Sequence, residues 1–260
     1  MSLILRNPHS VLAALETRPS DVQRVSLPNP VHSKGSDVDS PWARVEKLAR
    51  QKGIIIGAGA SPKKDVNRRD SRDLGKRDPD EGGRMGLAEA MVVERASVPV
   101  ERLFANAKER KEGKGLWIAL DCLQDPHNVG AIFRAAAFFG VEGILMTQER
   151  SAPLTGTVYD VASGGMEYVP FTVQANLQRG FEVAKEMGLW ILGTSEHTND
   201  DLRTIQRDRP WLLVLGNEET GMRRLTGESC DLLCKISQQG KVGSLNVSVA
   251  AGIFISHLTR

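Results

Sequence analysis

The chain has 260 residues, a formal net charge of +2, 40% hydrophobic and 25% charged residues, as is typical of a folded globular protein. These values exclude a wholly disordered or fibrous chain, and the longest apolar stretches, such as 247–255, are too short to span a bilayer. Three cysteines, Cys122, Cys230 and Cys234, are too few for a disulfide framework and lack zinc-ribbon spacing, which indicates a soluble protein of a reducing compartment.

The first part of the chain contains short helix and strand patterns around a charged segment. Apolar spacing predicts helices over 9–15 and 42–51, and the isoleucines at 54–56 predict a buried strand. Between 61 and 83, 13 of 23 residues are charged, which indicates a flexible insertion. Residues 1–110 hold 20 basic and 15 acidic side chains, against 14 and 17 in the rest. This part therefore either attracts an anion or simply has a solvated basic surface.

The second part of the chain alternates between apolar strands and helices. Strands are predicted at 116–120, 143–146, 189–192, 211–215 and 232–236, with helices at 129–139, 177–187 and 245–258. This alternation predicts a parallel sheet with helices on both faces. Residues 96–114 are expected to link the two parts. Ligands of such sheets bind beyond the carboxyl ends of the strands, so we expect a site in the loops that follow them.

Three of these loops carry polar residues suited to binding. The loop after the first strand leads to Asn128, which is placed like the N-cap of a helix. Arg134 follows among apolar helix residues, where a charged side chain is either buried in an ion pair or used in function. The loop Gly216-Asn-Glu-Glu-Thr-Gly221 either brings the backbone close to a ligand or is a generic turn. The third loop ends at Asn246, before an apolar helix that must be buried in the core or against a second subunit.

Several other chemistries lack their motifs in this sequence. No dinucleotide fingerprint follows a strand, and there is no Walker lysine loop or GxSxG nucleophile elbow. The five histidines are scattered without the spacing of metal ligands, so no metal site is expected.

Taken together, the three loops resemble a known family. The segments Asn128-Val-Gly-Ala-Ile-Phe-Arg134, Leu215-Gly-Asn-Glu-Glu-Thr-Gly221 and Ser244-Leu-Asn246-Val-Ser resemble, in order, the three motifs of the SpoU (TrmH) family of S-adenosylmethionine-dependent RNA 2′-O-ribose methyltransferases. The resemblance implies the SPOUT α/β fold, a parallel sheet with a deep C-terminal trefoil knot, over residues 115–260. Pro8-His-Ser-Val-Leu-Ala-Ala-Leu15 and Gly83-Arg-Met-Gly86 resemble the small L30e-like RNA substrate-binding domain of the family, here over residues 1–95.

The resemblance also implies roles for individual residues. Arg134 would assist deprotonation of the 2′-hydroxyl, with Asn128 orienting the ribose and Arg134. Glu218 and Asn246 would hold the reacting groups and the methionine part of the cofactor. The S-adenosylmethionine pocket would be formed by Thr194, Leu215, Gly216, Asn217, Gly221, Ile236, Ser244, Leu245 and Asn246.

The substrate and partners follow from the same resemblance. The two-domain layout is similar to bacterial and mitochondrial members that methylate a guanosine of large-subunit ribosomal RNA. The alternatives are the same chemistry on transfer RNA, or a catalytically silent RNA-binding or ribosome-assembly factor, which has no need of all four catalytic residues. We expect a homodimer packed partly through the last helix, with no membrane or metal partner. Because residues 1–6 lack the features of a secretory signal, we expect a cytoplasmic protein, or a mitochondrial matrix protein if the N-terminus is trimmed.

Overall fold

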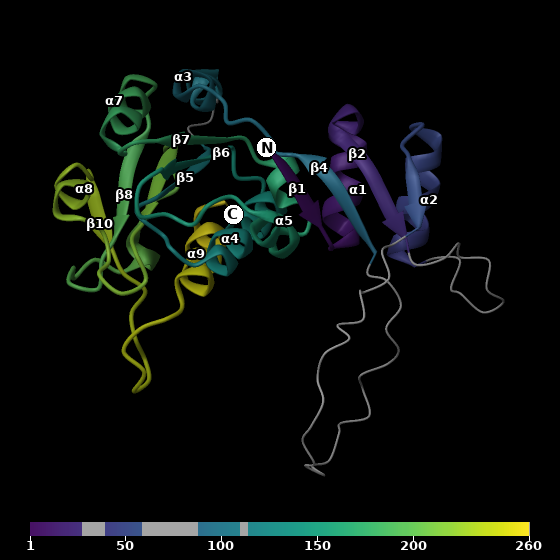
Figure 1. Cartoon of the computed structure of the whole chain (residues 1–260). Helices are drawn as coiled ribbons and strands as arrows, with labels where there is room; N and C mark the ends of the chain where they lie inside the picture. The colour runs from purple at the N-terminus through teal and green to yellow at the C-terminus, as the bar shows by residue number, and fades with distance from the viewer. Residues whose placement is uncertain (28–39, 59–87, 110–113, 260) are drawn as a thin grey trace, which may run out of the picture. The chain divides into compact units, whose positions relative to one another are not determined.

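The computed structural model describes residues 1–27, 40–58, 88–109 and 114–259, and it divides into two compact units, Met1–Val93 and Glu94–Arg260 (Figure 1). The expected charged insertion at 61–83 lies outside the described residues. No helix in the described ranges is long and apolar enough to cross a membrane.

The first unit is a four-stranded sheet with two helices. The strands β1 (Ser2–Leu5), β2 (Val22–Leu27), β3 (Ile56–Ala58) and β4 (Glu89–Val93) lie in the order β1-β4-β2-β3, and only the β2–β3 pair is parallel. The helices α1 (Pro8–Thr17) and α2 (Pro41–Gln51) confirm both helix predictions, and a 3₁₀ turn spans Pro19–Asp21. Each helix begins with proline after a capping side chain, Asn7 or Ser40, which accepts a hydrogen bond from a backbone N–H of the first turn.

The predicted buried strand at 54–56 is wrong in its position. Strand β3 begins only at Ile56, and the Ile55 side chain is 69% exposed. The carbonyl of Ile55 still accepts a hydrogen bond from the N–H of Val25. Among the described strands the segment is the edge of the sheet, with β2 as its one neighbour, and an apolar run cannot reveal that position.

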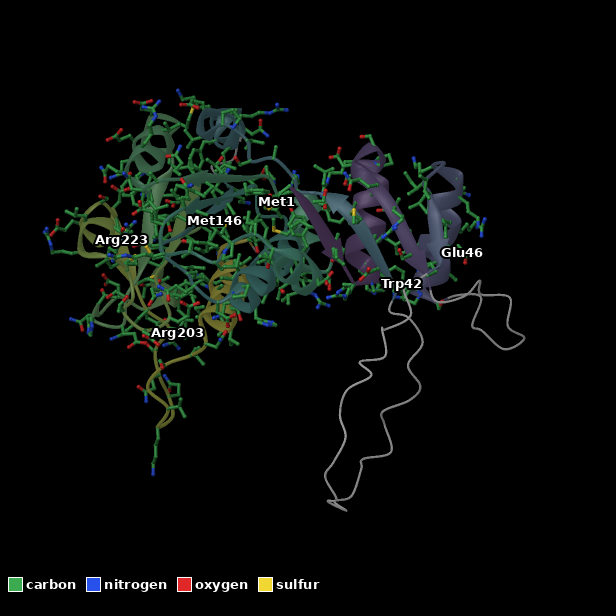
Figure 2. The ribbon with its side chains drawn as sticks, in the orientation of Figure 1. Met1, Trp42, Glu46, Met146, Arg203 and Arg223 are labelled. Atoms are coloured by element: carbon green, nitrogen blue, oxygen red, sulfur yellow. The ribbon has the colours of Figure 1, made fainter. Side chains whose placement is uncertain are left out.

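The second unit is a six-stranded parallel sheet with helices on both faces. The strands are β5 (Leu116–Leu120), β6 (Gly143–Thr147), β7 (Phe171–Gln174), β8 (Trp190–Thr194), β9 (Trp211–Leu215) and β10 (Leu232–Cys234), in the order β10-β8-β9-β5-β6-β7. Every residue of β5, β6 and β9 is buried, as their continuous apolar sequences predict. Met146 on β6, for example, lies between the helix layers (Figure 2).

The helices form two layers around this sheet. The helices α4 (Pro126–Phe139), α5 (Gly156–Ala162), α6 (Gly165–Tyr168) and α9 (Val247–Leu258) pack together on one face, and α3 (Val100–Leu103) and α7 (Gln178–Glu186) cover the other (Figure 1). Helix α8 (Arg224–Glu228) precedes the edge strand β10, and 3₁₀ turns span Ala105–Glu109 and Leu202–Thr204. Neither β7 nor the short helices α5, α6 and α8 were predicted.

The expected linker at 96–114 is wrong, because its described part belongs to the second unit. Val100, Leu103, Phe104 and Ala107 are buried in the core beside Trp117. The indole N–H of Trp117 donates to the carbonyl of Leu103 at 2.9 Å. These four residues follow the i, i+3, i+4, i+7 pattern of an amphipathic helix, which was present in the sequence. The boundary between the units falls at Val93 and Glu94.

The order of the strands determines where a ligand can bind. The chain runs outward from β5 through β6 to β7, then returns to the other side of β5 with β8, β9 and β10. The direction of winding therefore changes between β5 and β9. Loops leaving the carboxyl ends of two such strands diverge and leave a crevice between them.

Candidate active site

The loop after β5 delivers Asn128 to the carboxyl edge of the sheet, although not in the predicted way. Asp125 is the N-cap of α4, its side chain accepting from the N–H of His127 at 2.8 Å, and Pro126 is the first helical residue. The predicted N-cap position of Asn128 is therefore wrong. Asn128 lies within the first helical turn and is buried, so its side chain is directed inward.

Three predicted catalytic residues from three loops form one polar network. Asn246 Nδ2 donates to Asn128 Oδ1 at 2.9 Å, and Asn128 Nδ2 donates to Glu218 Oε1 at 3.1 Å. The other oxygen of Glu218 accepts from Asn217 Nδ2 at 3.2 Å. Each amide has one donor and one acceptor end, so the network fixes how Asn128 is turned. These bonds join segments that lie 90 and 118 residues apart in the sequence.

The network is anchored to the backbone at both ends. Asn246 is the N-cap of α9, where its Oδ1 accepts from the N–H of Ser248 at 2.9 Å. Glu218 also accepts long hydrogen bonds from the N–H groups of Gln124 and Asp125, both at 3.5 Å, just before α4. A carboxylate beside the start of a helix is also favoured by the helix dipole. The network is therefore held by two helix starts that face one loop.

The fourth predicted catalytic residue, Arg134, is not part of the polar network formed by the other three. It lies on α4, is exposed, and has no hydrogen-bond or ion-pair partner among the described residues. The buried ion pair considered for this arginine is therefore not formed within the described part of the chain. An unpaired guanidinium can clamp a phosphate or carboxylate of a bound molecule.

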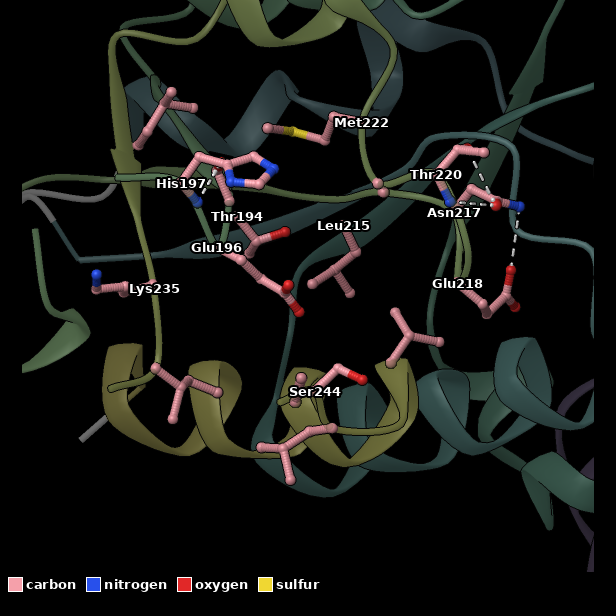
Figure 3. A pocket seen from close by; sticks show the side chains of 18 of the residues that line it. Thr194, Glu196, His197, Leu215, Asn217, Glu218, Thr220, Met222, Lys235 and Ser244 are labelled. Carbon is pink, nitrogen blue, oxygen red and sulfur yellow. Dashed lines mark hydrogen bonds between the residues drawn. The ribbon is translucent and has the colours of Figure 1, made fainter. Parts of the chain in front are cut away.

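Beside this network lies a cavity of about 440 Å³, within the size range of small-molecule sites (Figure 3). It opens between the carboxyl ends of β8, β9 and β10 and the segment that leads into α9. Eight of the nine predicted cofactor-binding residues line the cavity, namely Thr194, Leu215, Gly216, Asn217, Gly221, Ile236, Ser244 and Leu245. Asn246, the ninth, belongs to the polar network instead, and neither Asn128 nor Arg134 lines the cavity.

The loop after β9 forms one wall of this cavity by folding back on itself. Asn217 and Gly221 exchange two backbone hydrogen bonds of 3.0 Å, and Gly221 has φ +69°, where glycine is favoured. The Asn217 side chain accepts from the N–H groups of Glu219 and Thr220, as Figure 3 shows for Thr220. A Cβ on Gly216 would lie 2.2 Å from the backbone nitrogen of Met222. Only glycine allows this close approach.

The carboxyl end of β8 provides a further lining residue, which was not predicted from the sequence. Glu196 follows Thr194 and Ser195 after β8, and its carboxylate points into the cavity (Figure 3). It has no hydrogen-bond partner among the described residues. Apolar side chains, among them Leu215, Val247 and Phe254, form another part of the cavity wall. The cavity can therefore accept both a flat or apolar group and a hydrogen-bond donor.

Residues 115–256 match the family model described as the SpoU rRNA Methylase family. The chain belongs to this family. It is 45% identical over 168 residues to the 23S rRNA (guanosine-2′-O-)-methyltransferase RlmB of Nitrosomonas europaea, a match that covers 64% of this chain and 65% of that protein. The protein of the same name from Pseudomonas aeruginosa is 39% identical over 75% of this chain and 77% of its own length. The chain thus spans just under two thirds of the Nitrosomonas relative.

A solved structure of a SpoU methyltransferase is similar in fold to this chain beyond the range of the family model. The crystal structure of the SpoU methyltransferase AviRb from Streptomyces viridochromogenes, in complex with the cofactor AdoMet, aligns with a TM-score of 0.71. The alignment covers 99% of this chain and 89% of that one at 21% identity. Both the family resemblance and the parallel α/β fold are therefore confirmed, whereas the trefoil knot and the L30e-like character of the first unit stay predictions.

Proposed function

We propose that this SpoU family member is an S-adenosylmethionine-dependent RNA 2′-O-ribose methyltransferase that methylates a guanosine of large-subunit ribosomal RNA. The observation that carries the proposal is the network Asn246–Asn128–Glu218, which joins three distant loops next to a cavity of cofactor size. The names of the Nitrosomonas and Pseudomonas relatives support the reaction and the ribosomal substrate.

The residues of the cavity fit the cofactor. When bound, S-adenosylmethionine would supply a methyl group on a sulfonium centre. A deprotonated ribose oxygen that attacks the methyl carbon in line would form the O–C bond as the C–S bond breaks, releasing the sulfur as the neutral thioether S-adenosylhomocysteine, and no metal is needed. The apolar wall and the close backbone at Gly216 suit the adenine, and the Glu196 carboxylate suits a hydroxyl or ammonium donor. In the described part of the chain, no group of three or more histidine, cysteine, aspartate or glutamate side chains could hold a metal ion.

The four catalytic residues would divide the work of alignment and deprotonation. Asn128, held at both ends of its amide, would orient the ribose, and Glu218 and Asn246 hold Asn128 in turn. Arg134 would contact the substrate, because its guanidinium is exposed and unpaired within the described residues. A guanidinium is ordinarily a poor base, so Arg134 would assist deprotonation together with an RNA phosphate, or clamp that phosphate only.

The first unit would bind RNA, and the second would pair with a second copy of the chain. The basic excess of residues 1–110 supports the first assignment. Helix α9 supports the second, since one face is buried in the core while Val249 and Ile253 are 52% and 40% exposed. Sedimentation at micromolar concentration tests this assignment, which a monomer would contradict. The proposed compartment is the cytoplasm.

The reaction is tested with labelled S-adenosylmethionine and total ribosomal or transfer RNA from a methylation-deficient strain. We expect label in ribosomal RNA as 2′-O-methylguanosine. Arg134→Ala should lower transfer by about 100-fold or more. Cofactor affinity should be unchanged, because Arg134 does not line the cavity. Arg179→Ala is the matched control, since Arg179 is an exposed arginine that pairs with Glu101 away from the site.

The outcomes separate the alternatives. Label in transfer RNA alone would keep the chemistry and overturn the ribosomal substrate. Cofactor binding without transfer to free RNA or to ribosomal particles would favour a silent RNA-binding factor. Absence of cofactor binding by the unmodified protein would overturn the enzyme assignment altogether.

A further inference from the structure

A buried carboxylate at the end of β5 plays no part in the network described above. Asp121 directly follows β5, and its side chain is completely buried. Its partner is Arg223, which lies 102 residues further along the chain. Arg223 Nε and Nη2 approach Asp121 Oδ1 at 2.8 and 2.7 Å, and the backbone N–H of Arg223 donates to Oδ2 at 2.9 Å. Both carboxylate oxygens are therefore used by one residue.

This ion pair connects the loop after β5 to the cavity wall. Arg223 lines the cavity, and it is the last residue before α8 (Figure 2). The backbone N–H of Asp121 donates to the carbonyl of Leu215, the residue just before the folded-back loop, at 2.9 Å. Asp121 therefore holds both ends of the segment 216–222. Further along, the same segment is tied to the loop after β5 by Asn217 Nδ2, which donates to the carbonyl of Cys122 at 2.9 Å.

The corner that presents Asp121 has a strained backbone. Cys122 has φ +61°, which is uncommon for a residue other than glycine and costs roughly 1 kcal/mol or more. Its N–H donates to Thr147 Oγ1 at 3.0 Å, and its carbonyl accepts from Asn217. The conformation is therefore held by contacts from the end of β6 and from the loop after β9. It turns the chain sharply after β5 and leaves both Asp121 and the Cys122 carbonyl facing the loop after β9.

Stability alone does not account for a charged pair at this place. Removing a carboxylate from water is costly, and an apolar pair of similar volume is often at least as stable. The guanidinium fork, whose Nε and Nη2 both contact Oδ1, and the backbone N–H on Oδ2 instead provide fixed geometry. Burial lowers the pKa of Arg223, but the hydrogen bond and charge of Asp121 outweigh it and raise that pKa overall, so the arginine stays charged.

We propose that Asp121 and Arg223 are positioning residues that clamp the loop after β9 onto the loop after β5. The clamp sets the shape of the cofactor cavity and keeps Glu218 within reach of Asn128. This inference rests on the proposed function, because its effect is read through cofactor binding.

The test compares three variants of the full chain with the unmodified protein. Asp121→Asn keeps the side-chain shape and removes the charge, and Arg223→Lys keeps the charge and removes the fork. Asp231→Asn is the matched control. Asp231 pairs with Lys185 at 2.9 Å and accepts from the N–H of Ile191, and it lies just before β10, at the opposite end of that strand from the cavity. Calorimetry gives the Kd of S-adenosylmethionine, methyl transfer gives KM and kcat, and thermal unfolding reports the fold.

A clamp predicts a pattern that general destabilisation does not. We expect Asp121→Asn to raise the Kd and KM for S-adenosylmethionine about tenfold or more, with a smaller fall in kcat at saturating cofactor. Arg223→Lys should lie between Asp121→Asn and the unmodified protein. Asp231→Asn should lower the unfolding temperature and leave Kd within about twofold.

Two results would overturn the clamp. The first is that a folded Asp121→Asn protein binds the cofactor as tightly as the unmodified chain. The second result applies if Asp121→Asn does not fold: a folded Arg223→Lys protein then binds the cofactor as tightly as the unmodified chain. If the unmodified protein itself binds no S-adenosylmethionine, the proposed function fails and the clamp assignment fails with it. If the unmodified protein binds and methylates while both variants match it, only the clamp fails.

Discussion

Replacing Gly216 with alanine tests whether the folded-back loop after β9 builds the cofactor cavity. An added Cβ would lie 2.2 Å from the backbone nitrogen of Met222 and 2.3 Å from the carbonyl carbon of Gly221. Both are backbone atoms, so no side-chain rotation can relieve the contact. The loop itself has to move.

The size of the effect follows from these distances. Ordinary contacts of a Cβ begin near 3.4 Å, so the two segments must separate by roughly 1 Å. Overpacking of this kind costs about 1 to 3 kcal/mol, and about 1.4 kcal/mol corresponds to a tenfold change in Kd. Because the displaced atoms line the cavity, we expect the Kd of S-adenosylmethionine to rise about 10- to 100-fold.

The assay is calorimetric titration with S-adenosylmethionine, together with thermal unfolding. Gly180→Ala is the matched control. Its Cβ would lie as close as 2.3 Å to another atom, but that atom is the Cδ2 tip of the Leu145 side chain and not backbone. Gly180 lies on α7 and not on the cavity, and alanine favours a helix. The control should lower stability, because the core around Leu145 has to repack, and leave cofactor affinity intact.

Unchanged cofactor affinity in a folded Gly216→Ala protein would refute the reasoning, because it would mean that the loop can shift without affecting the ligand. An equal loss of affinity in Gly180→Ala would also refute it. The effect would then come from general destabilisation and not from the shape of the cavity.

Two further predictions concern Asn246 and the thiols of Cys230, which is half-buried, and Cys234, which is buried. Asn246→Asp keeps the acceptor that caps α9 but loses the Nδ2 donor to Asn128, so methyl transfer should fall about tenfold or more with little change in unfolding temperature. Asn246→Ala removes the cap as well and should also lose about 1 kcal/mol of stability. Methyl transfer at the unmodified rate in Asn246→Asp would show that this bond does not orient Asn128. Burial is the largest cause that raises the pKa of Cys230 and of Cys234 to about 12, from an ordinary value of 9.0. Their contribution to stability should be fully present below about pH 9 and be lost as the pH rises toward 12. In a Cys122→Ser background, iodoacetamide at pH 8 should therefore label them slowly until the protein is unfolded, and fast labelling of the native protein would contradict this.

The sequence by itself was enough for the class of fold and for the family. Strands buried on both faces must be apolar throughout, so β5, β6 and β9 could be recognised in the sequence as continuous runs of apolar residues. The loops that follow β5 and β9 could be identified as binding loops because parallel strands all end at one edge of the sheet. Glycines at 216 and 221 are local requirements of a tight turn, so they too were readable from the sequence.

Other features were present in the sequence but were missed. The apolar spacing of residues 100–107 marked a helical segment of the core, although residues 96–114 were predicted to be a linker. Asp125-Pro126 is an ordinary start signal for a helix and places Asn128 inside the first turn. Glu196 follows a predicted strand and could have been named by the rule that identified the other loops.

Only the tertiary structure decided which of these groups meet. The bonds Asn246–Asn128, Asn128–Glu218 and Asp121–Arg223 join residues 118, 90 and 102 positions apart. Their formation depends on the order β10-β8-β9-β5-β6-β7, which places β9 beside β5. The exposure of Arg134 is likewise a property of how α4 packs. Local preferences act over a few residues, whereas partners at this separation are chosen by the packing of whole strands and helices.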